Sequence, residues 1–222
     1  MSAGYQVAFQ TITVGDHPFE IRSLKDRQQY ADTGQLAHKA GVSPASWPLF
    51  GVMWPSGIML ADVVDRYPLR GLRVLEVGCG LGLASLVAHR HGADITASDY
   101  HPLAGEFMAE NAVMNQLAPL PFLRLDWKQI DPAAGKFDLI IGSDILYEPD
   151  HPRLLCRFIE RHAQETCTII VVDPGRRQRM EFSRRMVGNG FSLIPHLVNA
   201  VLAAQLGFTG RVLVYRRCPD KM

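Results

Sequence analysis

The feature that most constrains the fold is a short apolar strand that runs into a glycine-rich turn and then into a helix. Residues 73–77 form the strand, the run GCGLG occupies 78–82, and residues 83–90 have a helical pattern. Glycines let the backbone approach a ligand closely, and the first turn of a helix has N–H groups without partners in the helix. The pattern predicts the opening of a βαβ unit, with a nucleotide-like ligand over Gly78, Gly80 and Gly82.

Beyond the glycine turn, strand and helix patterns alternate along the chain. Short strands that alternate with longer helical segments are typical of βαβ units with a parallel sheet. We therefore predict an α/β fold with a doubly wound, mostly parallel sheet. The expected strands are 93–98, 121–125, 137–142 and 168–172, and the expected helices are 58–67, 103–117, 152–163 and 178–187.

Both ends of the chain depart from this alternation. Residues 5–14 and 19–24 flank a Gly-Asp turn and predict a β-hairpin appendage. Residues 25–57 are irregular and hold bulky aromatic residues among prolines, which predicts a segment that covers something. Near the other end, 191–197 and 211–217 predict a pair of strands, and the link between them is too short for a confident crossover helix. We expect this last pair to be antiparallel.

Length and composition indicate one structural unit. The chain has 222 residues, of which 47% are hydrophobic and 20% charged, and these values are ordinary for a single globular core. Within this unit we separate an N-terminal hairpin and lid segment, residues 1–57, from the ligand-binding domain, residues 58–222.

Charge and cysteine content exclude several functional classes. Lys and Arg number 23 against 22 acidic residues, so a net charge of +1 creates no global field for DNA or an anionic membrane. The four cysteines form no CxxC pair and the histidines lack metal-ligand spacing, which argues against a metal site. The sequence has no signal-peptide pattern and no apolar stretch of ~18 residues. We expect a cytoplasmic protein without a metal, DNA or membrane partner.

The glycine spacing separates two classes of cofactor. A dinucleotide fingerprint that starts at Gly78 requires glycine at the position of Leu83, which weakens the NAD interpretation. Glu76 lies near the carboxyl end of its strand, where a carboxylate suits an ammonium group, such as that of S-adenosylmethionine, better than a pyrophosphate. Asp99 ends the next strand, where it can accept bonds from two ribose hydroxyls. For both carboxylates, the capping of a helix or loop is the alternative.

Several segments together resemble a known enzyme family. They are EVGCGLG at 76–82, Asp99, ENAVMNQ at 110–116, Asp126-Trp127 and SDILYE at 143–148. With these motifs the chain resembles the seven-strand (class I) S-adenosylmethionine-dependent methyltransferases. Within them it looks most like the protein lysine methyltransferases that act on chaperones and on the electron-transfer flavoprotein β subunit. The resemblance runs from about residue 47 to 185 and implies a Rossmann-like fold, S-adenosylmethionine as cofactor and S-adenosylhomocysteine as product.

The resemblance also implies which residues contact the cofactor. Asp126 would accept a bond from the adenine amino group, and Trp127 would stack on the ring. The alternative for Trp127 is an anchor at the sheet edge. Trp54 would lie over the cofactor, with packing in the lid as its alternative. We also expect Ser143, directly before the Asp-x-x-Tyr segment, to contact the cofactor.

Asp144 and Tyr147 are the candidate catalytic residues. They follow the strand 137–142, at the sheet edge where open α/β folds have their ligand crevice, and in the family this segment lines the meeting point of methyl donor and acceptor. A carboxylate and a phenol there can orient an incoming amine and stabilise the positive charge that it acquires. Glu148 has the same chemistry, although a solvated position at a helix start is favoured.

The segment SDILYE also bears on the acceptor. It differs from the Asn/Asp-Pro-Pro-aromatic segment of enzymes that methylate adenine or glutamine, and from the Pro-Cys of cytosine methylation. A protein lysine is therefore the leading acceptor. A small-molecule N-methyltransferase and a non-catalytic scaffold subunit that keeps the cofactor site are the alternatives.

A basic cluster follows the expected strand 168–172. Such a cluster can dock an acidic protein surface or RNA, and its alternative is a solvated helix face. Residues 25–46 match no feature of the family, so the sequence leaves the identity of the substrate open. The members of the cluster are Arg176, Arg177, Arg179, Arg184 and Arg185, and Glu181 is the one acidic residue among them.

Overall fold

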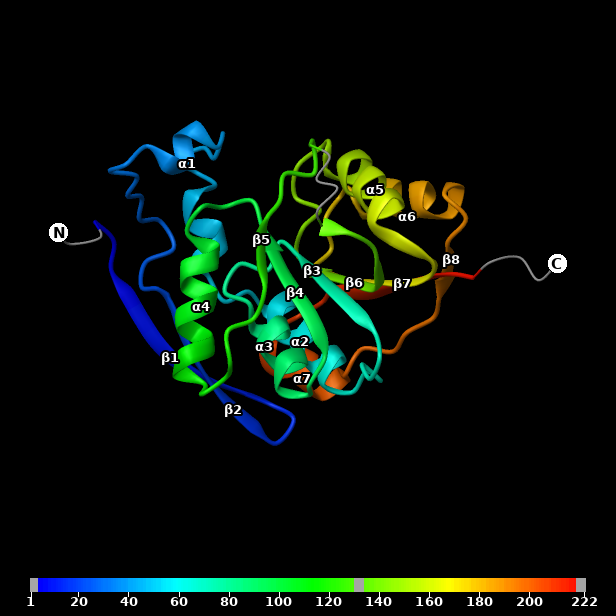
Figure 1. The fold of residues 1–222 in the computed structure, drawn as a ribbon, viewed down its shortest axis with the longest axis horizontal. Coiled ribbons are helices and arrows are strands. Elements are labelled where there is room, and N and C mark those ends of the chain that lie inside the picture. The colour runs from blue at the N-terminus through cyan, green and yellow to red at the C-terminus, as the bar shows by residue number, and fades with distance from the viewer. Residues whose placement is uncertain (1–3, 130–133, 219–222) are drawn as a thin grey trace.

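A seven-stranded sheet forms the centre of the computed structural model, which describes residues 4–129 and 134–218 (Figure 1). The strand order is β5-β4-β3-β6-β7-β9-β8, and within it β9 is antiparallel to both of its neighbours while the other pairs are parallel. The predicted α/β class and the predicted antiparallel last pair are confirmed. The strands are β3 Arg73–Val77, β4 Asp94–Asp99, β5 Phe122–Arg124, β6 Phe137–Ser143, β7 Ala163–Asp173, β8 Ser192–Ile194 and β9 Arg211–Arg217.

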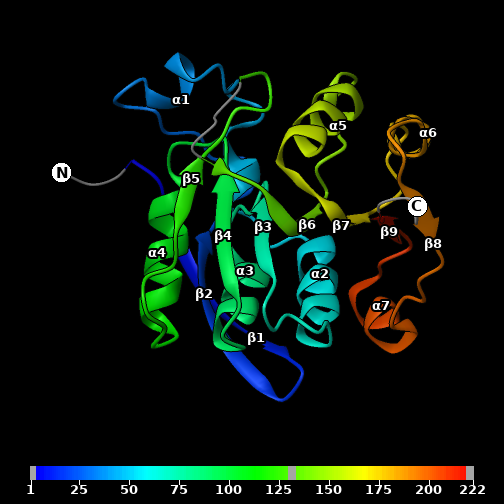
Figure 2. The ribbon, with the colours of Figure 1, turned by 45° about the vertical axis from the view of Figure 1, so that its right-hand side comes forward.

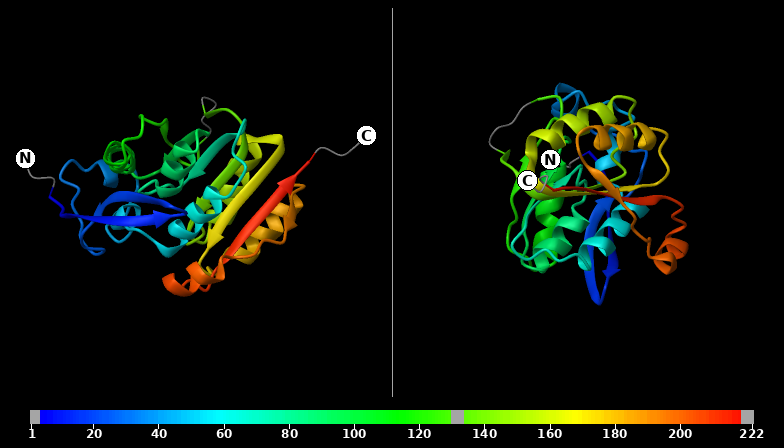
Figure 3. Two further views of the ribbon diagram at one scale, coloured as in Figure 1. Left: turned by 90° about the horizontal axis from the view of Figure 1, so that it is seen from below. Right: turned by 90° about the vertical axis from the view of Figure 1, so that its right-hand side faces the viewer.

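Helices cover both faces of this sheet (Figure 3, right). Apolar residues alternate between the faces, because side chains in a strand have a period of two: Leu139 and Ile141 belong to one core and Ile140 to the other. The first core lies under α2, α3 and α4, and the second under α5 and α6. The helices are α1 Leu36–Lys39, α2 Pro55–Asp65, α3 Leu83–Arg90, α4 Ala104–Met114, α5 His151–His162, α6 Arg179–Gly188 and α7 Ala200–Leu206, with a 3₁₀-helix, η1, at Trp47–Gly51.

The chain order reverses between β3 and β6, which are neighbours in the sheet. From β3 the chain continues outward to β4 and β5, and it then returns to β6 on the other side of β3. At such a switch point the loops after the two strands separate and leave a crevice at their carboxyl ends. The glycine turn after β3 and the segment after β6 therefore face each other.

The predicted N-terminal hairpin forms a separate two-stranded sheet of β1 Val7–Val14 and β2 His17–Leu24. Its buried face joins the first core of the main domain. Two buried amides, Asn111 of α4 and Asn115 directly after it, bind the backbone of β2: Asn115 accepts from Glu20 N at 2.9 Å, and Asn111 accepts from Arg22 N at 2.7 Å. These two side chains of ENAVMNQ thus make hydrogen bonds to β2 of the kind that a neighbouring strand would make. The division of the chain after residue 57 stays a prediction.

The segment between the hairpin and α2 folds over the carboxyl ends of the strands (Figure 2). Trp47 is its anchor: the side chain is fully buried, with its ring centroid 5.8 Å from that of Phe50 and 5.7 Å from that of His101. The aromatic residues of this irregular region are thus held by their own small cluster. From here on, the term lid segment means residues 41–54, which are one part of the lid predicted within residues 1–57.

The structure differs from the predictions at α7 and β7. The link between β8 and β9 contains α7, which begins after Asn199, whose side chain accepts a bond from Leu202 N at 3.2 Å. Strand β7 begins directly after α5, because Ala163 pairs with Phe137 beyond the apolar stretch that suggested the strand. Within residues 4–129 and 134–218, no helix is long and apolar enough to cross a membrane.

Candidate active site

One cavity of about 860 Å³ lies at the carboxyl ends of β3, β4 and β6. Its walls come from the glycine turn, from the segments after the strands and from the lid segment. The cavity brings together every residue that the sequence selected for the site, although these residues are spread over more than ninety positions of the chain. They are Trp54, Glu76, Gly78, Gly80, Gly82, Asp99, Asp126, Trp127, Ser143, Asp144 and Tyr147.

The glycine turn needs glycine for reasons of backbone conformation and packing. Gly80 has φ +54°, and a Cβ added there would lie 2.8 Å from the carbonyl oxygen of Phe50 in the lid segment. At Gly78, with φ +65°, a Cβ would lie 2.7 Å from Cγ2 of Ile145. Left-handed backbone of this kind is costly for residues with a side chain. The turn is therefore in close contact with both the lid segment and the segment after β6.

Asp99 joins the end of β4 to the glycine turn. Its Oδ2 accepts a hydrogen bond from Gly80 N at 2.9 Å, and its Oδ1 accepts one from His101 N at 2.7 Å. Burial raises the pKa of this carboxyl, although the backbone bonds act in the opposite direction. Each carboxylate oxygen has a second acceptor site, so Asp99 can bind hydroxyl groups in the cavity while it holds the turn.

Glu76 lies at the bottom of the cavity and is 3% exposed. Its Oε2 accepts bonds from both the backbone N, at 2.9 Å, and the hydroxyl of Ser85 in the first turn of α3. The capping that was the alternative for this residue is therefore present. Both bonds reach Oε2, which leaves Oε1 to a ligand. Burial raises the pKa of the Glu76 carboxyl to about 7. A cation bound beside this carboxyl would favour its ionised form and be attracted to it.

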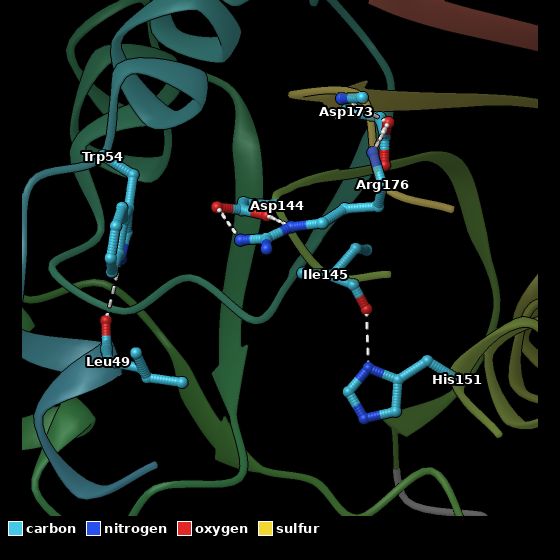
Figure 4. A network of polar contacts seen from close by, with 8 residues as sticks. Leu49, Trp54, Asp144, Ile145, His151, Asp173 and Arg176 are labelled. Carbon is cyan, nitrogen blue, oxygen red and sulfur yellow. Dashed lines mark hydrogen bonds and ion pairs between the residues drawn. The ribbon is translucent and has the colours of Figure 1, made fainter. Parts of the chain in front are cut away.

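Asp126 and Trp127 form the wall next to the loop after β5. Asp126 Oδ1 accepts a bond from Lys128 N at 2.9 Å, which fixes the carboxylate in a turn. The Trp127 ring meets the His151 ring edge to face, with centroids 5.4 Å apart. His151 Nδ1 lies 2.8 Å from the carbonyl oxygen of Ile145 and must donate to it, since that oxygen only accepts (Figure 4). Burial lowers the pKa of His151, so its Nε2 carries a lone pair.

Trp54 stands on the lid side of the cavity (Figure 4). Its Nε1 donates to the carbonyl oxygen of Leu49 at 3.0 Å, and the Arg27 guanidinium lies 5.8 Å from the ring. The wall continues through Gly41 and Val42, in the part of the predicted lid that matches no feature of the family.

Asp144 has both carboxylate oxygens bound by one guanidinium. Arg176 Nε donates to Oδ1 at 2.7 Å and Nη2 donates to Oδ2 at 3.0 Å (Figure 4). The backbone at Asp144 is left-handed, with φ +52°, and its N–H donates to Val172 O at 2.9 Å. Backbone strain in a cavity wall is typical of functional residues.

Tyr147 is the most exposed of the selected side chains that carry a hydroxyl, at 41%. Burial of the hydroxyl end and the nearby carboxylates raise its pKa to about 12, so the phenol is neutral. Its ring lies 4.6 Å from the His151 ring.

The cavity wall also contains residues that the sequence analysis did not select for the site, among them Arg176, His151 and part of the stretch 41–46 in the lid segment. Arg176 had a usable signal, since it follows the end of β7 next to β6, but its arginine neighbours made it look like part of a surface cluster. His151 had none, because its role depends on the Ile145 carbonyl.

The comparison with protein families decides the assignment. A family model described as lysine methyltransferase matches residues 48–187, more than half of the chain. The chain belongs to the lysine methyltransferase family. The resemblance inferred from the glycine turn, Asp99 and the Asp-x-x-Tyr segment is thereby confirmed, and with it the assignment to the methyltransferases.

Relatives with assigned names include three that illustrate the range of acceptors. The electron transfer flavoprotein β subunit lysine methyltransferase of Xenopus laevis is 34% identical over 139 residues, which cover 61% of this chain and 56% of that protein. The protein N-lysine methyltransferase METTL21A of Danio rerio is 34% identical over 59% of this chain and 65% of its own length. A histone-arginine methyltransferase, METTL23 of Xenopus laevis, is 34% identical over 44% of each chain. The match thus spans little more than half the length of the first of these relatives.

Solved structures confirm the fold. The magnesium protoporphyrin IX methyltransferase from Synechocystis, with bound S-adenosylmethionine, has a TM-score of 0.59 at 20% identity, covering 73% of this chain and 80% of its own. A methyltransferase-like structure, SMU.776, with bound S-adenosylhomocysteine, has a TM-score of 0.61 at 13% identity and covers 94% of this chain and 56% of its own. The predicted Rossmann-like methyltransferase fold is thereby confirmed.

Proposed function

We propose that this protein transfers a methyl group from S-adenosylmethionine to a lysine side chain of another protein. The observation that carries the proposal is the convergence of all eleven selected residues on one cavity in a member of the lysine methyltransferase family. The names of the electron transfer flavoprotein and N-lysine methyltransferase relatives support a protein lysine as acceptor.

The cavity has the donors and acceptors that S-adenosylmethionine requires. The buried Glu76 carboxylate suits an ammonium group, Asp99 retains acceptor sites for two ribose hydroxyls, and Trp127 offers a ring for an adenine. The close contacts of the glycine turn exclude side chains from the floor of the cavity. These residues fit the cofactor, and we propose that they hold it.

The acceptor side lies at Asp144 and Tyr147. Once bound, S-adenosylmethionine supplies a sulfonium methyl group: the amine lone pair forms the N–C bond, the C–S bond breaks, and its electron pair stays on sulfur. Asp144 retains one acceptor site on each oxygen beside its bonds to Arg176, so it can take an amine N–H and direct the lone pair. The neutral Tyr147 hydroxyl can accept a second N–H. Alignment of this kind supplies much of the rate enhancement in group transfer.

Exposure on the acceptor side favours a protein over a small molecule. The side chains of Tyr147 and Arg176 are each 41% exposed, so the acceptor side is open to a large partner. Exposed arginines follow on α5 and α6, which contact each other, and they support the proposal of an acidic surface on the partner. These arginines are Arg153, Arg157 and Arg184.

The test combines cofactor binding with acceptor identification. Calorimetric titration of the purified protein with S-adenosylmethionine, with S-adenosylhomocysteine and NAD in parallel, should give saturable micromolar binding of the first two, about −8 kcal/mol or tighter. Labelled-methyl transfer is then measured on recombinant electron transfer flavoprotein β subunit and on cell lysate. Amino-acid analysis of the labelled protein should yield methyl-lysine.

Each other outcome selects a different function. Label only in the low-molecular-weight fraction would establish a small-molecule acceptor. Methyl-arginine in the labelled protein would show that the acceptor residue is arginine and not lysine. Tight cofactor binding without transfer to any acceptor would support the scaffold alternative. If neither S-adenosyl compound binds, the proposal is withdrawn.

A further inference from the structure

The ion pair of Asp144 and Arg176 stands at the acceptor side of the cavity. Its two parallel bonds are the geometry in which a guanidinium matches a carboxylate best. The Asp144 side chain is 11% exposed and the Arg176 side chain 41%, so the cation lies on the outer side of the carboxylate.

Both partners are held by the backbone at the ends of adjacent strands. Asp144 follows β6 and is bound through its N–H to Val172 of β7. Arg176 is held by Asp173, the last residue of β7, whose Oδ1 accepts from Gly175 N at 2.8 Å and from Arg176 N at 2.9 Å (Figure 4). The pair is thus built into the sheet edge, which distinguishes Arg176 from the arginines of the surface cluster.

We infer that Arg176 is a positioning residue that cancels the charge of Asp144, so that the cavity receives the acceptor amine without its proton. This inference rests on the proposed function. A carboxylate alone would stabilise the ammonium form of a lysine, which has no lone pair and cannot form the N–C bond. A neighbouring cation has the opposite effect and favours the free amine. The proton leaves to water before transfer.

Other charged groups face the same region from the elements around it. Asp173 is near enough to interact electrostatically with both members of the pair, and the neutral Tyr147 is near enough to interact with Asp144 and Arg176. Because Arg176 is the cation that contacts Asp144 directly, its removal changes the local charge by one full unit. The groups around the acceptor position are Asp99 at the end of β4, Asp144, Tyr147 and Glu148 after β6, His151 on α5, Asp173 at the end of β7, Arg176, and Arg179 on α6.

Two substitutions of Arg176 test the inference, with its sequence neighbour as control. Arg176→Gln removes the cation, Arg176→Lys keeps the charge without the fork, and Arg177→Gln removes an exposed arginine that does not line the cavity. The readout is the pH dependence of single-turnover methyl transfer to the labelled acceptor protein, which remains measurable when the rate falls a hundredfold. We expect Arg176→Gln to move the acidic limb up by about one pH unit. Arg176→Lys and Arg177→Gln should leave it near the wild-type position.

A double variant separates charge from structure. If Arg176 acts by cancelling Asp144, then Asp144→Asn in the Arg176→Gln protein removes the uncancelled charge and returns the limb toward the wild-type pH. A structural role for Arg176 predicts lower rates without this return. In ¹⁵N-labelled protein, the Arg176 Nε–H signal should be protected from exchange with water, and Asp144→Asn should abolish that protection while Arg177→Gln leaves it unchanged.

The outcomes distinguish the inference from the proposed function. Normal S-adenosylmethionine binding with an unmoved acidic limb in Arg176→Gln would overturn the inference alone. An unprotected Nε–H in the wild type would also overturn it, since no fixed pair would then exist. Absence of S-adenosylmethionine binding by the wild type would overturn the proposed function, and the inference with it.

Discussion

The two ends of the cavity differ in the groups that form their walls. At the end that we propose for the cofactor, the cofactor end, left-handed glycines form the floor, and buried carboxylates are bound to backbone N–H groups, as Asp99 is to Gly80. At the end that we propose for the acceptor, the acceptor end, side chains form the wall, and the principal contact is the ion pair of Asp144 with Arg176. The cofactor end depends mainly on the course of the main chain, and the acceptor end depends more on a contact between two side chains.

This difference matches the demands on each end. All members of a methyltransferase family share one cofactor, whereas the named relatives differ in acceptor, from the electron transfer flavoprotein β subunit to histone arginine. A site built on the backbone is hard to alter by substitution, and exposed side chains are easy to alter. We therefore expect substitutions at the cofactor end to affect binding and stability together, and those at the acceptor end to affect transfer alone.

The largest effect is expected for Gly80→Ala. The added Cβ would lie 2.8 Å from the Phe50 carbonyl oxygen at φ +54°, so both lid segment and turn must shift. We expect cofactor affinity to fall at least about a hundredfold, and the free energy of unfolding to fall by about 1–3 kcal/mol. Calorimetry and denaturant unfolding measure the two losses.

Gly92→Ala is the matched control for the loss at Gly80. Gly92 has φ +74°, but a Cβ there meets nothing within 4 Å and the residue does not line the cavity. It should show the backbone penalty with normal cofactor binding. Equal cofactor affinities of the two variants would contradict the view that the cofactor end depends on the close contacts of its glycine turn.

Asp144→Asn tests the acceptor end. Asparagine tolerates left-handed backbone better than alanine, so the substitution removes charge with little added strain at φ +52°. We expect turnover to fall about a hundredfold, because the acceptor amine loses the carboxylate that orients it, while cofactor affinity stays within about threefold. If affinity falls as far as turnover, Asp144 belongs to the cofactor end instead.

Glu76→Gln tests whether the buried carboxylate makes stability and cofactor affinity depend on pH. The pKa of Glu76 is raised from 4.5 to about 7, so the folded protein binds more protons than the unfolded chain between these values. Stability without ligand therefore falls as pH rises through this window. An ammonium ligand needs the carboxylate, so cofactor affinity should rise with pH over the same window and level off above it.

The glutamine variant should lose both dependences on pH. At neutral pH it should bind S-adenosylmethionine about tenfold more weakly, the value of one hydrogen bond to a charged group. Calorimetry from pH 5.5 to 8 measures the effect. Wild-type affinity that is constant over this range would exclude Glu76 as the partner of the ammonium group.

The smallest effect is expected for Tyr147→Phe. The Tyr147 phenol, whose pKa of about 12 keeps it neutral, contributes at most a hydrogen bond to the amine. Loss of about 1 kcal/mol would slow transfer about fivefold without a change in cofactor affinity. Single-turnover labelling measures this, and a loss as large as that of Asp144→Asn would show that the phenol has a larger role than positioning.

Much of the cavity could be predicted because its residues follow strand ends. Glu76, Asp99 and Asp144 each stand at the carboxyl end of a parallel strand, and such ends meet at one edge of the sheet. Strand and turn patterns are local, so the sequence displays them directly. The roles of these residues as ligands of cofactor and acceptor stay predictions until the experiments above are done.

The sequence by itself determined the alternation of strands and helices, the glycine turn and the family, because each depends on residues close together in the chain. Only the tertiary structure decided the pairing of Asp144 with Arg176, the fixed tautomer of His151 and the lid wall at residues 41–46. These contacts join segments whose separation in the sequence carries no periodic pattern. They depend on how the strand ends and the lid segment pack around one cavity. That packing is set by the directions of side chains and the distances between them, which the order of residues does not reveal.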